Sequence, residues 1–173
     1  MTDWTPPAGH SLLWRRRQWL AAAGALALSG CAGSQPAPEA TYLLLDGSRI
    51  TNAELRGKVT FVNFWATSCT TCVAEMPDMV STYQRYQSQG YDTLAVAMQY
   101  DPPAFVVNFA QTRKLPFKVA IDNTGSVSRA WGNIQLTPTS FLLDKQLRVD
   151  KTYVGAPDFS ALHARIETLL SQA

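Results

Sequence analysis

Apolar residues recur along the chain with two different periods, and the changes of period predict the elements at its centre. A continuous apolar and β-branched run over Val59–Trp65 is typical of a strand that is covered on both faces. Apolar residues between positions 73 and 83 then recur at helical spacing, and Gly90 is expected to end that helix. A second apolar run over residues 93–98 predicts another buried strand. The centre of the chain is therefore predicted as strand, helix, strand.

The flanking segments continue this alternation. Residues 41–45 predict a short strand that ends at the turn of residues 46–47, and residues 51–55 predict a brief helical turn. Asp101 is expected to cap a helix that runs to about Arg113. The remaining pattern predicts a strand at residues 117–121, a short helix at residues 127–131, a hairpin of residues 139–143 and 149–154, and a terminal helix over residues 159–170. This order predicts an α/β domain with a mixed sheet and helices on both faces.

The first 30 residues have the pattern of a secretory signal and not of the folded domain. A basic stretch at residues 14–18 precedes an apolar run at residues 19–28, which is only half of the roughly 20 residues that a membrane-spanning helix needs. The boundary that follows, Leu-Ser-Gly-Cys ending at Cys31, resembles the lipobox of bacterial lipoproteins, in which the cysteine is acylated and becomes the first residue. Residues 16–20 also resemble a twin-arginine export signal.

Three segments are therefore expected along the chain. Residues 1–30 are the signal peptide, residues 31–40 are a lipidated tether rich in small residues and proline, and residues 41–173 are one domain. The resulting localisation is the periplasmic side of a bacterial membrane, with the lipid bilayer as a partner through Cys31. The final domain has no predicted internal repeat.

Removing the signal changes the charge of the chain. Residues 1–30 contain three arginines and one aspartate, so the rest has 12 basic and 12 acidic side chains and no net charge. No basic patch stands out in the sequence, and nucleic acid is therefore not an expected partner.

The chemistry-bearing feature is the pair Cys69 and Cys72, at the junction of the first buried strand and its helix. Helix-end amides and the helix dipole stabilise a thiolate at the first cysteine, and the thiolate is the nucleophile. The pair closes too small a loop to add much stability, and a structural zinc site would need two further ligands. His163, the one histidine after the signal, lies in a separate helix pattern that is expected at the surface. The sequence therefore favours redox chemistry, which requires no metal or organic cofactor.

One sequence motif of this chain resembles that of the membrane-tethered thioredoxin-like proteins of the TlpA, ResA and CcmG type. Residues 63–72 read Asn-Phe-Trp-Ala-Thr-Ser-Cys-Thr-Thr-Cys, with Glu75 and Pro77 downstream, and the similarity extends from about Thr41 to the C-terminus. The resemblance implies a thioredoxin fold with an N-terminal extension and an inserted helix–strand pair. It also implies an extracytoplasmic thiol–disulfide oxidoreductase, often a reductant in cytochrome c maturation. The chain departs from the family at Ser68, where Trp is usual, and at Thr71, where proline is common.

Roles are also expected for residues outside the cysteine pair, and the resemblance assigns the first two of them. Thioredoxin folds place a cis-proline opposite the disulfide, which here is Pro138, and Thr137 then offers backbone groups to an extended substrate. Trp65 is expected in the core with one exposed edge near Cys69, as part of the substrate-binding surface. Glu75 is an acidic residue early in a helix and a candidate acid or base.

The function predicted on these grounds is reduction of periplasmic protein disulfides, with apocytochrome c as a candidate substrate and a transmembrane thiol carrier as electron donor. Cys69 attacks the target and Cys72 resolves the mixed disulfide. An oxidant or isomerase is the alternative within redox chemistry, because direction follows reduction potential. Hydroxyls at Ser68, Thr70 and Thr71 would favour the oxidant if they donated to the Cys69 thiolate, but they are expected to cap backbone amides instead. A Cu(I) metallochaperone that uses the same two cysteines is a further alternative.

Overall fold

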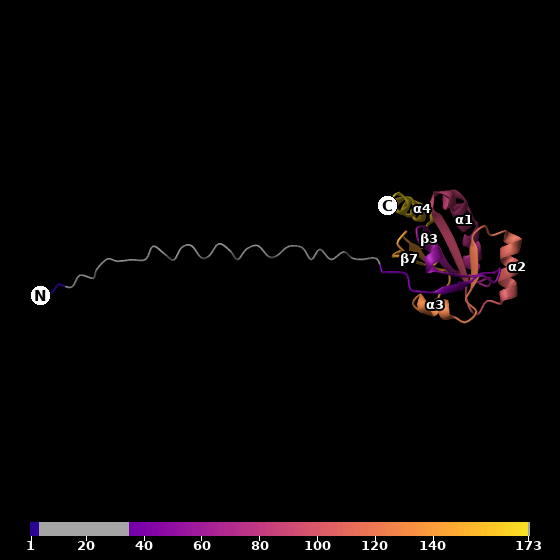
Figure 1. Cartoon of the computed structure of the whole chain (residues 1–173), viewed down its shortest axis with the longest axis horizontal. Coiled ribbons are helices and arrows are strands. Elements are labelled where there is room, and N and C mark those ends of the chain that lie inside the picture. Colours follow the sequence, from indigo (N-terminus) through magenta and orange to yellow (C-terminus); the bar gives the residue numbers. More distant parts are fainter. Residues whose placement is uncertain (4–34, 173) are drawn as a thin grey trace. The chain divides into compact units, whose positions relative to one another are not determined.

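A five-stranded mixed sheet forms the centre of the domain in the computed structural model, which describes residues 1–3 and 35–172 (Figure 1). The order across the sheet is β5-β4-β3-β6-β7. Strands β3, β4 and β5 are parallel, whereas β6 is antiparallel to β3 and β7 to β6. The bounds are Val59–Trp65 for β3, Tyr91–Ala97 for β4, Lys118–Ile121 for β5, Thr139–Leu143 for β6 and Val149–Val154 for β7.

Helices cover both faces of this sheet, so the predicted thioredoxin fold is confirmed. Three helices pack with one apolar cluster on one face: α1 (Thr70–Tyr86), α2 (Pro103–Arg113) and α4 (Phe159–Ser171). The second cluster, on the opposite face, contains residues of the short helix α3 (Ser126–Ala130) and of the N-terminal extension. A 3₁₀ turn, η2 (Gln87–Gln89), continues α1 to Gly90, whose left-handed backbone ends it as predicted.

The N-terminal extension is a hairpin and not the single strand that the pattern predicts. Strand β1 (Thr41–Leu43) pairs antiparallel with β2 (Arg49–Thr51), and the 3₁₀ turn η1 (Asn52–Leu55) follows. Strand β2 was not predicted because its three residues, two of them exposed, are too few to establish an alternation of apolar and polar positions. The helical turn was predicted, and a capping box between Thr51 and Glu54 explains where it begins.

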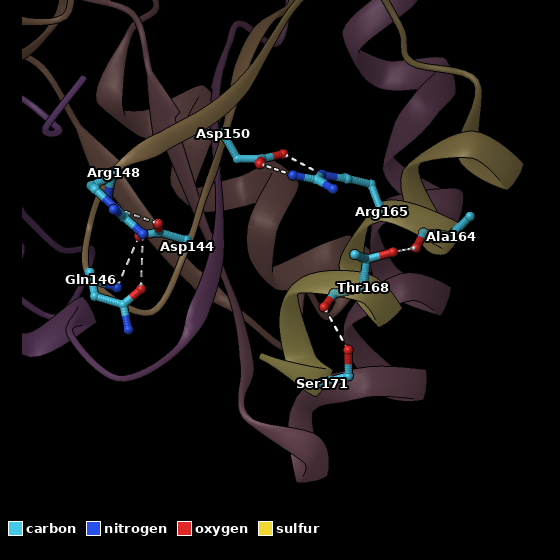
Figure 2. A network of polar contacts seen from close by, with 8 residues as sticks. All are labelled: Asp144, Gln146, Arg148, Asp150, Ala164, Arg165, Thr168 and Ser171. Atoms are coloured by element: carbon cyan, nitrogen blue, oxygen red, sulfur yellow. Dashed lines mark hydrogen bonds and ion pairs between the residues drawn. The ribbon is translucent and has the colours of Figure 1, made fainter. Parts of the chain in front are cut away.

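Polar contacts attach the terminal helix to the edge of the sheet (Figure 2). Arg165 on α4 donates to both carboxylate oxygens of Asp150 on β7, from Nε to Oδ2 over 2.7 Å. Near the end of the same helix, the Thr168 hydroxyl donates to the carbonyl oxygen of Ala164 over 2.9 Å. A bidentate guanidinium–carboxylate pair constrains orientation as well as distance, and α4 is thereby held against β7.

The register of the sheet brings four loops to a single edge. Phe64, near the end of β3, lies opposite Val96 near the end of β4 and opposite Thr139 at the start of β6. Thr139 in turn lies opposite Val154 at the end of β7. Since parallel strands end at the same edge and antiparallel strands begin there, the segments just beyond this row of residues converge.

The residues expected to form a signal peptide and a lipid anchor, 1–30 and Cys31, lie almost wholly outside the described residues. Within residues 1–3 and 35–172, no helix combines the length and apolarity needed to cross a membrane.

Candidate active site

The two cysteines form a disulfide at the start of α1. Their Cα atoms lie 5.2 Å apart, and Cys69 is the N-cap residue of the helix. Cys72 is fully buried, whereas Cys69 is half-buried, so only the first sulfur can meet a partner without rearrangement. This difference in exposure supports the predicted order of attack, because a disulfide exchange needs access to the attacking sulfur.

The Cys69 sulfur itself caps the helix, which differs from the expected hydroxyl cap. It accepts a hydrogen bond from the Cys72 amide over 3.2 Å. In the described part of the chain, none of the hydroxyls of Ser68, Thr70 and Thr71 donates to this sulfur, and all three residues are exposed. The sulfur therefore occupies the position in which a helix-end amide stabilises a thiolate, without further stabilisation from these hydroxyls.

The loop that precedes β6 lies against the disulfide. The Thr137–Pro138 peptide bond is cis, as predicted. The Thr137 carbonyl oxygen lies 3.4 Å from the Cys69 sulfur, and the Thr137 side chain is within 3.3 Å of the Tyr100 hydroxyl. Tyr100 belongs to the loop after β4 and was not among the predicted site residues. Two segments that lie 68 residues apart in the sequence thus meet at the attacking sulfur.

A buried carboxyl group lies one turn beyond the second cysteine. Glu75 is 3% exposed, and Asn63 on β3 donates from its amide to Glu75 Oε1 over 2.9 Å and to the Ser140 hydroxyl over 2.9 Å. Burial raises the pKa of Glu75 to about 7, against the smaller opposing effect of the Asn63 hydrogen bond. The sequence predicted that Glu75 lies early in the helix, but it did not predict that Glu75 is buried. Side chains at i and i+3 share a helix face, so Glu75 and Cys72 are neighbours inside the domain.

Trp65 has no exposed edge, so that part of the prediction was wrong. Its side chain is fully buried and packs on the Phe109 ring of α2, with ring centroids 5.1 Å apart. Helix α2 covers the end of β3 on this face, which removes the tryptophan from contact with a substrate. Trp65 and Cys72 belong to the same apolar cluster, and Cys69 packs against it.

Asp101 holds the cysteine loop instead of capping α2. The residue at the N-cap of α2 is Pro102, and both carboxylate oxygens of Asp101 accept from Thr67, one from its amide and one from its hydroxyl, each over 2.6 Å. Asp101 is buried and Thr67 lies two residues before Cys69. The loop after β4 therefore fixes the loop after β3.

His163 is also placed differently from the expectation. It lies half-buried between α4 and α1, where Nε2 is 2.8 Å from the Thr82 hydroxyl, and its ring packs edge-on against Tyr86. Desolvation lowers its pKa. Within residues 1–3 and 35–172, no three histidine, cysteine or acidic side chains gather into a possible metal site.

A cysteine pair at the N-terminus of the first helix of a thioredoxin-like fold, facing a cis-proline loop, defines a thiol–disulfide oxidoreductase. Comparison with known proteins agrees with this class. The Redoxin family profile matches residues 32–166, and the chain belongs to that family.

Individual relatives make the class more specific. The thiol–disulfide oxidoreductase ResA of Bacillus thuringiensis subsp. konkukian is 39% identical over 119 residues, which cover 69% of this chain and 68% of the relative. ResA of Geobacillus thermodenitrificans is 35% identical over 133 residues, 77% of this chain and 75% of the relative. The protein is therefore a thiol–disulfide oxidoreductase of the ResA type.

Solved structures show the same fold. A solution structure from Neisseria meningitidis has a TM-score of 0.75 and 40% identity, and covers 82% of this chain and 93% of that one. A thiol:disulfide interchange protein of the thioredoxin family from Chlorobium tepidum has a TM-score of 0.73 at 30% identity, with 81% and 99% of the two chains covered.

Proposed function

We propose that this protein reduces disulfide bonds of exported polypeptides on the periplasmic side of a bacterial membrane. The Cys69 thiolate attacks one sulfur of the target disulfide, forms a mixed disulfide and releases the other target sulfur as a thiolate. Cys72 then loses its proton and attacks Cys69, so that the second target sulfur leaves and the Cys69–Cys72 disulfide forms. Two electrons and two protons pass to the target, and a membrane dithiol carrier then supplies another two of each, so that the Cys69–Cys72 pair is reduced and the carrier becomes a disulfide.

The observation that carries the direction of this reaction is the burial of Glu75 one turn after Cys72. A carboxyl group with a pKa near 7 is partly ionised at neutral pH, and its negative charge disfavours a thiolate nearby. Destabilising the thiolate destabilises the dithiol form, and the protein then gives up its electrons more readily. In this proposal, the same carboxylate accepts the Cys72 proton when that cysteine attacks.

The direction is tested by titrating the Cys69–Cys72 pair against a dithiothreitol buffer. A reductant is expected to have a potential more negative than about −180 mV, the value of protein disulfide isomerase. A more positive value would reassign the protein as an oxidant or isomerase. Glu75→Gln removes the charge but keeps the shape, so its potential is expected to rise by about 30 mV, which corresponds to about one pKa unit.

The order of attack is tested by trapping. Cys72→Ser is expected to accumulate mixed disulfides with periplasmic proteins, because the half-buried Cys69 still attacks but nothing resolves the product. Cys69→Ser is the matched control and is expected to trap almost none. Trapping by Cys69→Ser alone would reverse the assignment. Mass spectrometry of the trapped species would also show whether apocytochrome c is among the substrates, as the resemblance to the cytochrome c maturation proteins suggests.

A further inference from the structure

The chain joins the domain at the edge of the sheet that lies opposite the disulfide. The Val149 amide donates to the Gln35 carbonyl oxygen over 2.7 Å, and the Ala37 amide donates to the Leu147 carbonyl oxygen over 2.8 Å. Strand β7 begins at Val149 and reaches the edge of the cis-proline loop only at its last residue, Val154. The N-terminal segment is therefore bound at the end of the sheet that is farthest from the cysteine pair.

The chain between this attachment and the expected lipid anchor is short. The Asn52 side-chain amide donates to the Pro38 carbonyl oxygen over 2.7 Å, and Ala37 is buried, so the segment after Gln35 packs on the domain. Three residues separate Gln35 from Cys31 in the sequence. Because an extended chain spans at most about 3.6 Å per residue, the two Cα atoms lie within about 14 Å of each other. With an acylated Cys31 in a bilayer, this edge of the domain lies next to the lipid surface.

Basic side chains gather at the same edge of the sheet. The segments that lead into β3, β4, β5 and β7 meet there, and they comprise residues 52–58, 87–92, 114–118 and 144–148. These segments contain six basic and three acidic side chains, a net charge of +3, and they are too far apart in the sequence to form a basic run. We call the six basic residues the basic edge: Arg56, Lys58, Lys114, Lys118, Lys145 and Arg148, with Glu54, Asp92 and Asp144 as the acids.

The buried acid of this group leaves part of the positive charge uncompensated. Asp92 is 1% exposed, and its Oδ2 accepts from the ammonium groups of both Lys58 and Lys118, which remain partly exposed. Two ammonium groups share one carboxylate, so the three side chains together carry one positive charge. Asp144 pairs with Arg148 over 2.7 Å (Figure 2).

The remaining members of the basic edge have no carboxylate partner. Arg56 and Lys114 are exposed, and neither forms an ion pair within residues 1–3 and 35–172. Lys145 donates to the carbonyl oxygens of Leu170 and Gln172 at the end of α4, which are not charged. These three side chains leave positive charge available to an anionic partner.

The edge that carries the disulfide has the opposite sign. The connecting segments there contain three aspartates, Asp101, Asp122 and Asp158, and no basic residue: they are residues 66–69, 98–102, 122–125, 131–138 and 155–158. Residues 31–173 have no net charge, but their charges are thus separated along the direction of the strands. A domain with such a separation is oriented by the field of a charged surface.

We propose that the basic edge rests on the anionic phospholipid surface of the membrane that holds Cys31, with the Cys69–Cys72 disulfide facing away from the lipid. This inference rests on the proposed function only in its membrane location. A lipid surface is favoured over an acidic protein because the short chain after Cys31 keeps the lipid within reach at all times.

The orientation has a consequence for the electron donor. Strand β3 has seven residues, and at about 3.3 Å per residue it places the disulfide roughly 20 Å beyond the basic edge. The membrane dithiol carrier must therefore present its cysteines outside the headgroup layer, while exported polypeptides reach Cys69 from the side away from the lipid.

The experiment uses the lipid-carrying protein, purified from membranes and placed in vesicles of phosphatidylcholine alone or mixed equally with phosphatidylglycerol. Amide hydrogen exchange is followed by mass spectrometry. Residues 52–58 and 144–148 are expected to exchange about tenfold more slowly in the anionic vesicles, because basic side chains bind such a surface. Residues 66–69 and 135–138 are expected to exchange equally in both. Salt at about 1 M, where the Debye length falls to about 3 Å, is expected to abolish the difference.

Two matched double variants test the charges. Arg56→Gln combined with Lys114→Gln removes two exposed charges of the basic edge and is expected to reduce the difference to less than about threefold. Arg129→Gln combined with Lys151→Gln removes the same charge at exposed positions elsewhere and is expected to keep the full difference. Neither pair is expected to change the rate at which Cys69 reacts with glutathione disulfide.

Three results would overturn the proposal. The first is equal exchange of the basic edge in the two kinds of vesicle, and the second is slower exchange of residues 135–138 in the anionic ones. The third is a membrane-purified protein whose mass shows no lipid on Cys31, because the lipid surface is then not held within reach. The redox titration is independent of all three, so a failure of the reductant assignment leaves this orientation in place.

Discussion

At the scale of single residues, the site depends on one buried acid and one amide. Asn63 occupies a fully buried position on β3 and donates to both Glu75 and Ser140, so it orients a carboxyl group that would otherwise lack a donor on Oε1. An asparagine cannot exchange a proton as a carboxyl group does, but it positions the residue that can. In the proposed mechanism, the acid–base group near Cys72 therefore lies on α1 and not on the central strand.

The burial of Glu75 predicts how stability depends on pH. Because its pKa is raised from 4.5 to about 7, the native state binds more protons than the unfolded state between these values, and the free energy of unfolding falls as pH rises through this window. Between pH 5 and pH 8 the loss from this group is about 2 to 3 kcal/mol. Urea unfolding of the oxidised protein at both pH values measures it.

Glu75→Gln is expected to remove this part of the pH dependence. Glu39→Gln, which removes a carboxylate at an exposed position, is expected to leave it in place. If the wild type and Glu75→Gln lose the same free energy between pH 5 and pH 8, then Glu75 does not titrate in this range.

At the scale of elements, the loop after β4 connects both sides of the disulfide. Asp101 in this loop accepts from Thr67 in the cysteine loop, and Tyr100 beside it contacts Thr137 in the cis-proline loop. The sequence pattern predicted a helix cap at Asp101 because an acid before two prolines is a common start signal. Since Pro102 occupies the cap position, the carboxylate is free to bind a neighbouring loop.

Asp101→Ala is expected to lower the free energy of unfolding by about 2 to 3 kcal/mol, because it leaves the Thr67 amide and hydroxyl without their acceptor. Asp101→Asn keeps one acceptor oxygen and is expected to lose about half as much. Denaturant unfolding gives these values, with Glu39→Ala as the control for the loss of an exposed carboxylate. A loss below about 0.5 kcal/mol in Asp101→Ala, typical of surface substitutions, would mean that the bonds to Thr67 add nothing.

At the scale of the whole molecule, the pattern of residues 1–31 predicts that the domain is tethered to a membrane through Cys31. Cys31→Ser is expected to move the protein to the soluble periplasmic fraction or to block its processing, because no acyl chain is then attached. Cell fractionation followed by mass spectrometry of the N-terminus measures both outcomes. Cys69→Ser, which keeps the lipobox, is the control and is expected to remain with the membrane. A correctly cleaved Cys31→Ser protein that stays in the membrane fraction would indicate another anchor.

The sequence by itself determined the elements and the reactive pair. Val59–Trp65 and the strand over residues 91–97, which was predicted at residues 93–98, are continuous apolar runs, and the helix between them has apolar residues at helical spacing. Local pattern was therefore enough to predict these elements. The spacing of Cys69 and Cys72 is also local, because three residues on one helix turn bring two sulfurs together. The hairpin partner β2 was missed because three residues are too few to show a period.

Apart from the cis-proline loop, which the resemblance places opposite the disulfide, only the tertiary structure decided what surrounds the cysteine pair. The Thr137 carbonyl lies 68 residues from Cys69, Asp101 lies 34 residues from Thr67, and Asn63 lies 77 residues from Ser140. These contacts follow from the register of β3 with β4 and β6, and a register shifted by two residues would fit the same apolar pattern while separating each pair. Burial of Trp65 and Glu75 likewise depends on which helix covers the end of β3. The local sequence pattern does not indicate which helix covers this end, because that depends on packing between segments far apart in the sequence.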